Sequence, residues 1–142
     1  MLCWVKLPPC GRRRARRRCF ADGNARLQQE HRSARGRNLW NQQQDPTAHA
    51  ETVAIRRFLP EHGIEKLKGT TLYTSGESCP MCMGAIVWCG IARVVYGASI
   101  AALAAKVGQI MITDADIADK TPFADIILTG GVFAEESLKL FK

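Results

Sequence analysis

Two short motifs in this chain combine residue types that bind zinc. The first is His49-Ala50-Glu51, and the second is Cys79-Pro80-Met81-Cys82. Zinc prefers imidazole and thiolate ligands in tetrahedral geometry, and one His with two Cys leaves a fourth position open to water, as catalytic zinc sites do. A Cys-x-x-Cys pair alone more often belongs to a structural zinc site or a redox pair. The two motifs together predict a zinc site with His49, Cys79 and Cys82 as ligands.

Both motifs coincide with signals that begin a helix. Asp45-Pro46 pairs an N-cap residue with proline at the first helical position, and Cys79-Pro80 opens a second helix. Cys79 and Cys82, three residues apart, share a helix face, but residues two apart do not share one in mid-helix. His49 and Glu51 therefore face one ion only if it lies beyond the start of their helix. Two helix N-termini directed at the ion also stabilise the negative charge of its ligands.

The elements that carry these motifs alternate between helices and strands. We predict helices over 46–59, 79–90 and 135–141, and strands over 70–74, 93–96, 109–113 and 126–129. Such alternation is typical of an α/β layer fold with parallel strand pairs.

The N-terminal quarter differs in kind from the rest of the chain. The net charge is +7, but residues 1–37 hold eleven Lys or Arg against two acidic residues, and residues 38–142 hold nine against eleven. The basic charge therefore belongs to the N-terminal segment, so it says little about the remainder. We expect residues 1–35, with their arginine run at 12–18, to be poorly ordered, and residues 36–142 to form a single domain.

Composition excludes several classes of protein. The chain is 46% apolar and 23% charged, which is close to the globular average and excludes collagen-like and wholly disordered proteins. No apolar run approaches the ~18–20 residues that a membrane-spanning helix needs, and no secretory signal is visible, so we expect no membrane association. The six cysteines, outside any secreted context, favour a reducing compartment and a cytoplasmic location.

Longer motifs around the predicted site resemble one family of enzymes. They are 45–51 (DPTAHAE), 72–86 (LYTSGESCPMCMGAI), 93–98 (RVVYGA) and Gly36-x-Asn38. Over about residues 36–142 the chain is similar to the cytidine deaminase-like zinc-dependent nucleobase and nucleoside deaminases, especially the branch of guanine deaminases and tRNA adenosine deaminases. The resemblance implies a three-layer α/β/α fold with a mixed central sheet, one zinc ion per chain and a homodimer.

The resemblance also implies a hydrolytic reaction that releases ammonia. Zinc bound by His49, Cys79 and Cys82 lowers the pKa of a water molecule from 15.7 to roughly 7. Glu51 does not bind the metal. It takes the proton of that water, passes it to a ring nitrogen of the base, and protonates the departing amine.

Three further residues are expected at the substrate. By resemblance, Asn38 and the backbone N–H of Ala50 bind the polar edge of the base, and Trp88 lines or backs the pocket. The expected substrate is a free purine base or nucleoside, with guanine first.

The chain departs from the family pattern at two places. Ser78 stands where the family usually has proline in Glu-Pro-Cys. The family also places a helix and a β-hairpin before Gly-x-Asn, whereas arginines occupy the positions in residues 1–35 where β-branched residues belong. We therefore expect the N-terminal hairpin to be disrupted.

Three alternatives remain open at this point. The first is a tRNA adenosine deaminase, although residues 38–142 are slightly acidic and such an enzyme needs a basic surface. The second is an inactive relic with an incomplete sheet. The third is a nucleic-acid-binding module that acts through the arginine run, whose affinity would fall steeply with salt.

Overall fold

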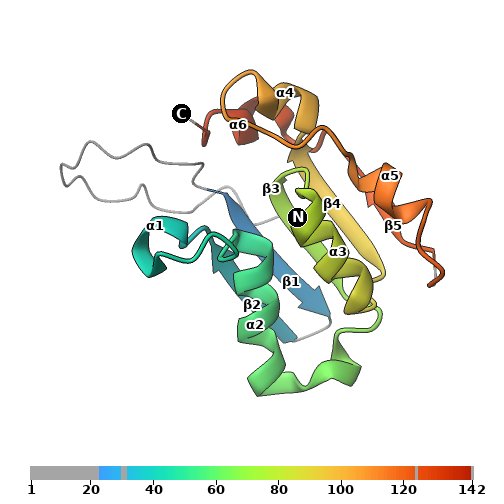
Figure 1. Ribbon diagram of the computed structural model, residues 1–142. Helices are drawn as coiled ribbons and strands as arrows, with labels where there is room; N and C mark the ends of the chain where they lie inside the picture. The colour runs from blue at the N-terminus through green and yellow to red at the C-terminus, as the bar shows by residue number, and fades with distance from the viewer. Residues whose placement is uncertain (1–22, 30–31, 124, 142) are drawn as a thin grey trace.

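A computed structural model describes residues 23–29, 32–123 and 125–141, and these residues form a mixed five-stranded sheet with helices against it (Figure 1). The strand order is β2-β1-β3-β4-β5. β1 is antiparallel to β2 and β3, whereas β3, β4 and β5 run parallel. The strands are β1 (Asn24–Gln29), β2 (Arg32–Arg37), β3 (Thr71–Gly76), β4 (Arg93–Ala98) and β5 (Ile127–Thr129). This arrangement confirms the predicted α/β fold with a mixed sheet.

Helices contact both faces of the sheet. α2 (Ala50–His62) and α3 (Pro80–Trp88) lie over one face, where Phe58 and Ile86 pack in the main core with Leu72 and Val94 of the strands (Figure 1). α6 (Ala134–Leu138) packs at Gly97, which points to the opposite face because it lies three residues after Val94. The remaining helical segments are α1 (Trp40–Gln43), η1 (Ile64–Lys66), α4 (Ile100–Ala104) and α5 (Asp114–Ala118). Within the described residues, no helix is long and apolar enough to cross a bilayer.

The strand predicted over 109–113 is wrong, whereas the one predicted over 126–129 is confirmed as β5. β5 pairs with β4 at one edge of the sheet, and residues 109–113 belong to no strand. The apolar run of that segment is instead exposed, with Ile110 and Met111 each 61% exposed. Thr113 ends it as the N-cap of α5, in a reciprocal capping box with Asp116. The short apolar run predicted a buried strand, but the tertiary structure leaves these residues exposed.

The N-terminal hairpin is present, so the expectation that it is disrupted is wrong. β1 pairs with β2 in a register that sets Ala25 opposite Gly36 and Leu27 opposite Ala34. These residues are buried, whereas Arg35 and Arg37, at the alternate positions of β2, are exposed. A half-buried strand needs a small or apolar residue only at every second position, so arginines at the alternate positions are compatible with it.

The hairpin also changes the N-terminal boundary. The predicted limit after residue 35 falls inside β2, and the pattern of buried residues begins in β1. The alternative of an inactive relic rested on a missing hairpin, and the paired strands remove that reason. The part of the expectation that concerns residues 1–22 lies outside the described residues.

Gly36→Ala is expected to destabilise the fold, because β2 and the start of α2 touch backbone to backbone at this point. A Cβ on Gly36 would overlap the carbonyl oxygen of Ala50 and lie 2.5 Å from the backbone nitrogen of Ala54. Backbone atoms cannot turn aside as a side chain does, so we expect the free energy of unfolding to fall by about 3 kcal/mol or more. Urea denaturation measures this change.

Gly84→Ala is the matched control for Gly36→Ala. Gly84 lies in α3, and a Cβ there meets nothing within 4 Å. Alanine in a helix is favoured over glycine by up to about 1 kcal/mol, so this variant should be as stable as the parent or slightly more so. Equal stability of the two variants would contradict the close approach of β2 to α2.

Candidate metal centre

His49 and Glu51 lie at the start of α2. His49 is the N-cap, with φ −69° and ψ 159°, and Glu51 is the second residue of the helix. The helix begins later than the predicted Pro46, because Asp45 closes a separate turn in which Oδ1 accepts the backbone N–H of Thr47 at 2.8 Å. This shift places His49 and Glu51 in the one region of a helix where residues two apart face a common point beyond its end.

Cys79 and Cys82 lie at the start of α3 in the same way. Cys79 is the N-cap, with φ −68° and ψ 162°, and Pro80 is the first helical residue, as predicted. The N-termini of α2 and α3 are close together, so the His49 ring nitrogen and the two cysteine sulfurs all lie within 4.8 Å of one another. His49 Nδ1 is 3.5 Å from Cys79 Sγ.

These three donors fit a zinc ion. Zinc ligands at about 2.0–2.3 Å in tetrahedral geometry lie about 3.5–3.8 Å from one another. The observed separation of Nδ1 and Sγ falls in this range, and the remaining separations need only small side-chain rotations. One imidazole and two thiols also match the donors that zinc prefers, and Cys82 is fully buried where the ion would lie.

Glu51 lies beside this cluster without belonging to it. Only 9% of the residue is exposed, and the Cys82 thiol lies 3.6 Å from its Oε2. Burial raises the pKa of Glu51, more than the neighbouring His49 lowers it. A carboxyl group with a raised pKa next to a metal centre is suited to accept a proton and to give it up again near neutral pH.

The two thiols shift each other's pKa in opposite directions. The hydrogen bond from Cys82 stabilises the Cys79 thiolate and lowers the pKa of Cys79 to about 4, with help from His49. The same interaction, with burial, raises the pKa of the Cys82 thiol far above its ordinary value. The hydrogen bond with Cys79 also raises the pKa of His49. A cation that binds both sulfurs must displace the proton of the Cys82 thiol, so its affinity is expected to rise with pH.

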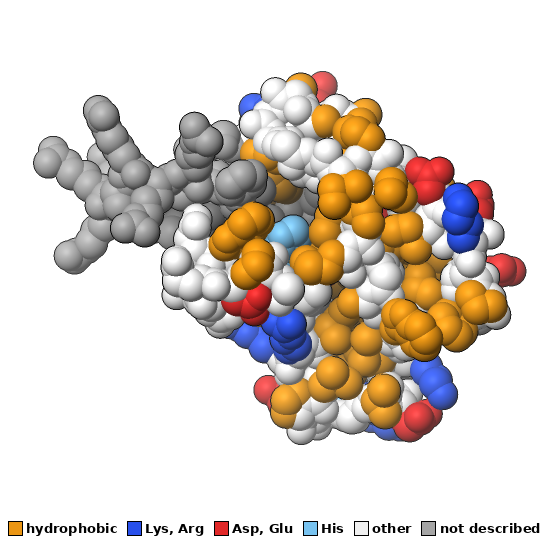
Figure 2. Space-filling model, viewed as in Figure 1, with side chains coloured by type: hydrophobic (Ala, Val, Ile, Leu, Met, Phe, Trp, Pro, Cys, Tyr) orange, Lys and Arg blue, Asp and Glu red, His pale blue; other side chains and the backbone are white. Residues whose placement is uncertain are grey.

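A cavity of about 370 Å³ opens in front of the donors, with His49, Glu51 and Cys79 among its lining residues. Figure 2 shows a histidine side chain in pale blue inside a hollow that apolar side chains border. Asn38 and Ala50 also line this cavity. The structure therefore brings together both predicted metal-ligand motifs, Glu51 and two of the three residues predicted at the substrate.

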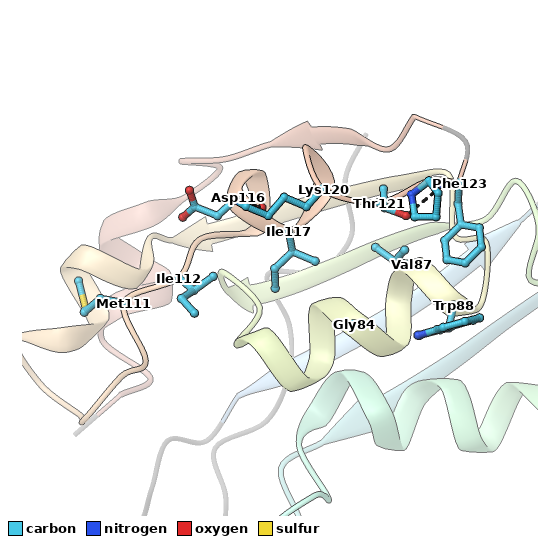
Figure 3. A pocket seen from close by; sticks show the side chains of 11 residues that line it. Gly84, Val87, Trp88, Met111, Ile112, Asp116, Ile117, Lys120, Thr121 and Phe123 are labelled. Atoms are coloured by element: carbon cyan, nitrogen blue, oxygen red, sulfur yellow. Dashed lines mark hydrogen bonds between the residues drawn. The ribbon is translucent and has the colours of Figure 1, made fainter.

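Trp88 does not line this cavity, contrary to the prediction. It is the last residue of α3, at the opposite end from Cys79 and Cys82, and it is 78% exposed. Its ring packs against Phe123 with centroids 5.0 Å apart. Both rings border a second cavity of about 750 Å³ between α3 and the segment that contains α5 (Figure 3). A helix rises about 1.5 Å per residue, so the length of α3 keeps Trp88 away from the metal donors.

Glu77 anchors the loop that carries Cys79, and the motifs did not reveal this role. Its Oε2 accepts the backbone N–H of Ile100 at 2.7 Å, and its Oε1 accepts that of Asp114 at 3.1 Å. Its own N–H donates to the carbonyl of Ala98 at 2.8 Å. One buried carboxylate thus joins the starts of α4 and α5 to the residue two positions before a metal ligand. No local signal marks these partners, because they lie far along the chain.

Asp114 is a buried carboxyl group behind the same loop. It is 0% exposed, and neither of its oxygens makes a hydrogen bond of good geometry within the described residues. Burial is the main cause that raises the pKa of Asp114 to about 7, and the negative charge of Glu77 adds to it. The backbone N–H of Ser78 acts in the opposite direction and lowers the pKa. The ordinary pKa of this side chain is 3.8, so the folded protein holds the proton at a pH where the unfolded chain has lost it.

Asp114→Asn is therefore expected to flatten the dependence of stability on pH. A raised pKa in the folded state stabilises the protein fully below pH 3.8, and this contribution is lost as the pH rises through about 7. Asparagine does not ionise, so the variant should lose less melting temperature than the parent between about pH 5 and 8. Asp119→Asn, an exposed position after the same helix, controls for the loss of one negative charge. If the melting temperatures of the parent and of Asp114→Asn change equally with pH, the raised pKa of Asp114 is contradicted.

Comparisons with known proteins agree with this geometry. Residues 23–98 match the family model described as the cytidine and deoxycytidylate deaminase zinc-binding region. The chain is 48% identical over 65 residues to the guanine deaminase of Bacillus subtilis and 43% identical over 65 residues to the tRNA-specific adenosine deaminase of the same organism. Each match covers 46% of this chain, but only 42% and 40% of those proteins, so the chain matches less than half of their length.

A solved structure extends the match along the chain. It comes from a study of A-to-I editing by tRNA:A34 deaminases and superposes with a TM-score of 0.70 at 30% identity. The alignment covers 84% of each of the two chains. The structural similarity therefore spans a larger share of the chain than the 46% that the curated relatives match.

Proposed function

Because this chain belongs to the family of the cytidine and deoxycytidylate deaminase zinc-binding region, we propose that it removes the exocyclic amine of a purine base or nucleoside by hydrolysis and releases ammonia. One observation carries the proposal. His49, Cys79 and Cys82 converge at two helix N-termini on the floor of a cavity, with the buried carboxyl group of Glu51 beside them. This arrangement supports a zinc-dependent hydrolase.

In the proposed mechanism, His49 Nδ1 and the sulfurs of Cys79 and Cys82 hold the ion. Zinc in such a site lowers the pKa of a water molecule to about 7 and so supplies a hydroxide nucleophile at neutral pH. Glu51 Oε2 accepts the proton of the water, and the carboxyl group then delivers it to the ring nitrogen beside the reacting carbon. The same carboxyl group carries a second proton to the amine as the carbon–nitrogen bond breaks. Water and the amine are thereby converted to a carbonyl group and ammonia.

Guanine is the first substrate that we propose. The guanine deaminase relative has the higher identity of the two curated relatives compared above, and the cavity has a size suited to a small ligand. Asn38 and the backbone N–H of Ala50 line the cavity and are proposed to bind the polar edge of the base. The homodimer that the resemblance implied remains a prediction.

One observation favours tRNA adenosine as a second candidate. The solved structure from the study of tRNA:A34 deaminases matches most of the chain. A tRNA substrate needs a basic surface, however, and residues 38–142 hold nine Lys or Arg against eleven acidic residues. Only the arginines of residues 1–37 provide such charge, so tRNA turnover should fall steeply with salt if they bind it.

Ammonia release from the zinc-loaded full chain tests the proposal. Guanine, guanosine, adenine, cytosine and a tRNA with adenosine at the wobble position are compared, with Glu51→Ala as the control. Release from guanine or guanosine that depends on Glu51 would support the first proposal. Release from tRNA alone would replace it with the second, and no release from any substrate would contradict both.

A further inference from the structure

Trp40 places an aromatic ring at the wall of the site cavity, and no motif indicated this role. The residue begins α1 and lines the same cavity as His49, Glu51 and Cys79. The ring centroids of Trp40 and His49 are 6.1 Å apart, and the ring planes differ by only 21°. A planar ligand that lies parallel to one of these rings therefore lies nearly parallel to the other.

The backbone around Trp40 is fixed to the start of α2. Asn38 Oδ1 accepts the backbone N–H of Trp40 at 3.0 Å, and Leu39 donates its N–H to the carbonyl of Ala48 at 2.9 Å. At the other end of the short helix, the N–H of Asp45 donates to the Trp40 carbonyl at 3.2 Å. The backbone that carries the indole is thus held in relation to the start of α2 before any ligand arrives. A wall that is fixed in advance costs less ordering when a ligand binds.

The rest of the cavity lining leaves a mainly apolar slot above a polar floor. Its other lining residues include the apolar Met81, Leu103, Val107 and Phe141. The ionisable lining residues are the metal donors His49 and Cys79 and the two carboxyl groups of Glu51 and Glu77. An aromatic base with a polar edge matches this division, because its faces contact the apolar and aromatic side chains and its edge reaches the floor.

We propose that Trp40 is the residue on which the substrate base stacks, and that it selects purines over pyrimidines. This proposal rests on the function proposed above. Every base has an aromatic face, but the two fused rings of a purine cover more of the indole than the single ring of a pyrimidine, and stacking grows with this overlap. A purine therefore gains more from Trp40 than a pyrimidine does.

Kinetics of the Trp40→Leu and Trp40→Phe variants test the proposal. Leucine removes the aromatic face, so we expect the KM for guanine to rise about tenfold or more, while kcat changes much less. Phenylalanine should restore most of the affinity. The preference for guanine over cytosine, as the ratio of kcat/KM values or of inhibition constants, should fall in Trp40→Leu and recover in Trp40→Phe.

Trp88→Leu and Trp88→Phe are the matched controls. Trp88 is a tryptophan as well, but it is exposed and borders the second cavity, so its loss should leave the KM for guanine and the purine preference unchanged. Zinc content and melting temperature are measured for all four variants. Loss of zinc from both Trp40 variants would show that Trp40 only supports His49, and would overturn the proposal.

Fluorescence gives a readout that does not need turnover. In zinc-loaded Glu51→Ala protein, guanine should quench tryptophan emission, and the quenching should persist after Trp88→Phe and disappear after Trp40→Phe. Equal quenching in both backgrounds would overturn the stacking role. If the parent releases no ammonia, the proposed function fails, whereas quenching that depends on Trp40 would still support stacking. If the parent is active but Trp40→Leu has an unchanged KM and purine preference, the stacking proposal alone fails.

Discussion

Glu51→Gln should keep its zinc and lose about 10²–10⁴-fold in kcat, the range that a positioned general acid and base contributes. Glutamine has nearly the same shape, so the start of α2 and the three metal donors should stay in place. It neither accepts a proton from water nor delivers one to the base, and Glu51 is the carboxyl group beside the cluster in the cavity. Ammonia release and zinc content, measured on the same preparation, check both parts.

Glu61→Gln is the matched control for this variant. Glu61 lies near the other end of α2, and its side chain is 70% exposed. The substitution removes the same charge from the same helix, so it should leave kcat and zinc content close to those of the parent. Turnover in Glu51→Gln at the parent rate would exclude Glu51 as the group that moves the proton.

Cys82→Ser removes a direct zinc ligand. The loss of a residue that only supports a ligand lowers metal affinity roughly 10–100-fold, so this variant should lose more than that. Cys82 is 0% exposed, and its sulfur lies within 4.8 Å of the donor atoms of Cys79 and His49. The remaining pair of donors binds a divalent ion weakly. Competition with a coloured chelator measures the affinity. The rise in melting temperature that zinc produces in the parent should largely disappear, because that rise depends on binding to the folded state.

Cys89→Ser is the matched control in the same helix. Cys89 is a half-buried free cysteine at the C-cap of α3, seven positions from Cys82 and outside the donor cluster. Its substitution should leave zinc affinity unchanged and alter stability only slightly. Equal zinc affinities for Cys82→Ser and Cys89→Ser would show that the cluster is not the zinc site.

Local patterns predicted the metal donors correctly because the information lies within a few residues. Pro80 after Cys79 indicated a helix start, and the three-residue spacing to Cys82 placed two sulfurs on one face. Residues two apart can face one ion only at the start of a helix. His49 and Glu51 do lie at the start of α2, although this helix begins later than predicted. The parallel strands β3 and β4 also followed from short β-rich runs bounded by turn residues.

Features that depend on distant partners escaped the same reasoning. The hairpin was missed because arginines dominate the composition of its strands. The need for small residues in β2 becomes visible only in the folded structure, where β2 packs against α2. Trp88 and Trp40 are both aromatic residues near a motif, yet only Trp40 lines the site cavity. The amino-acid sequence sets caps, spacing and donor chemistry, because these act over one or two helical turns. Which side chains surround the donors depends on packing between elements remote in the chain, and only the folded structure shows it.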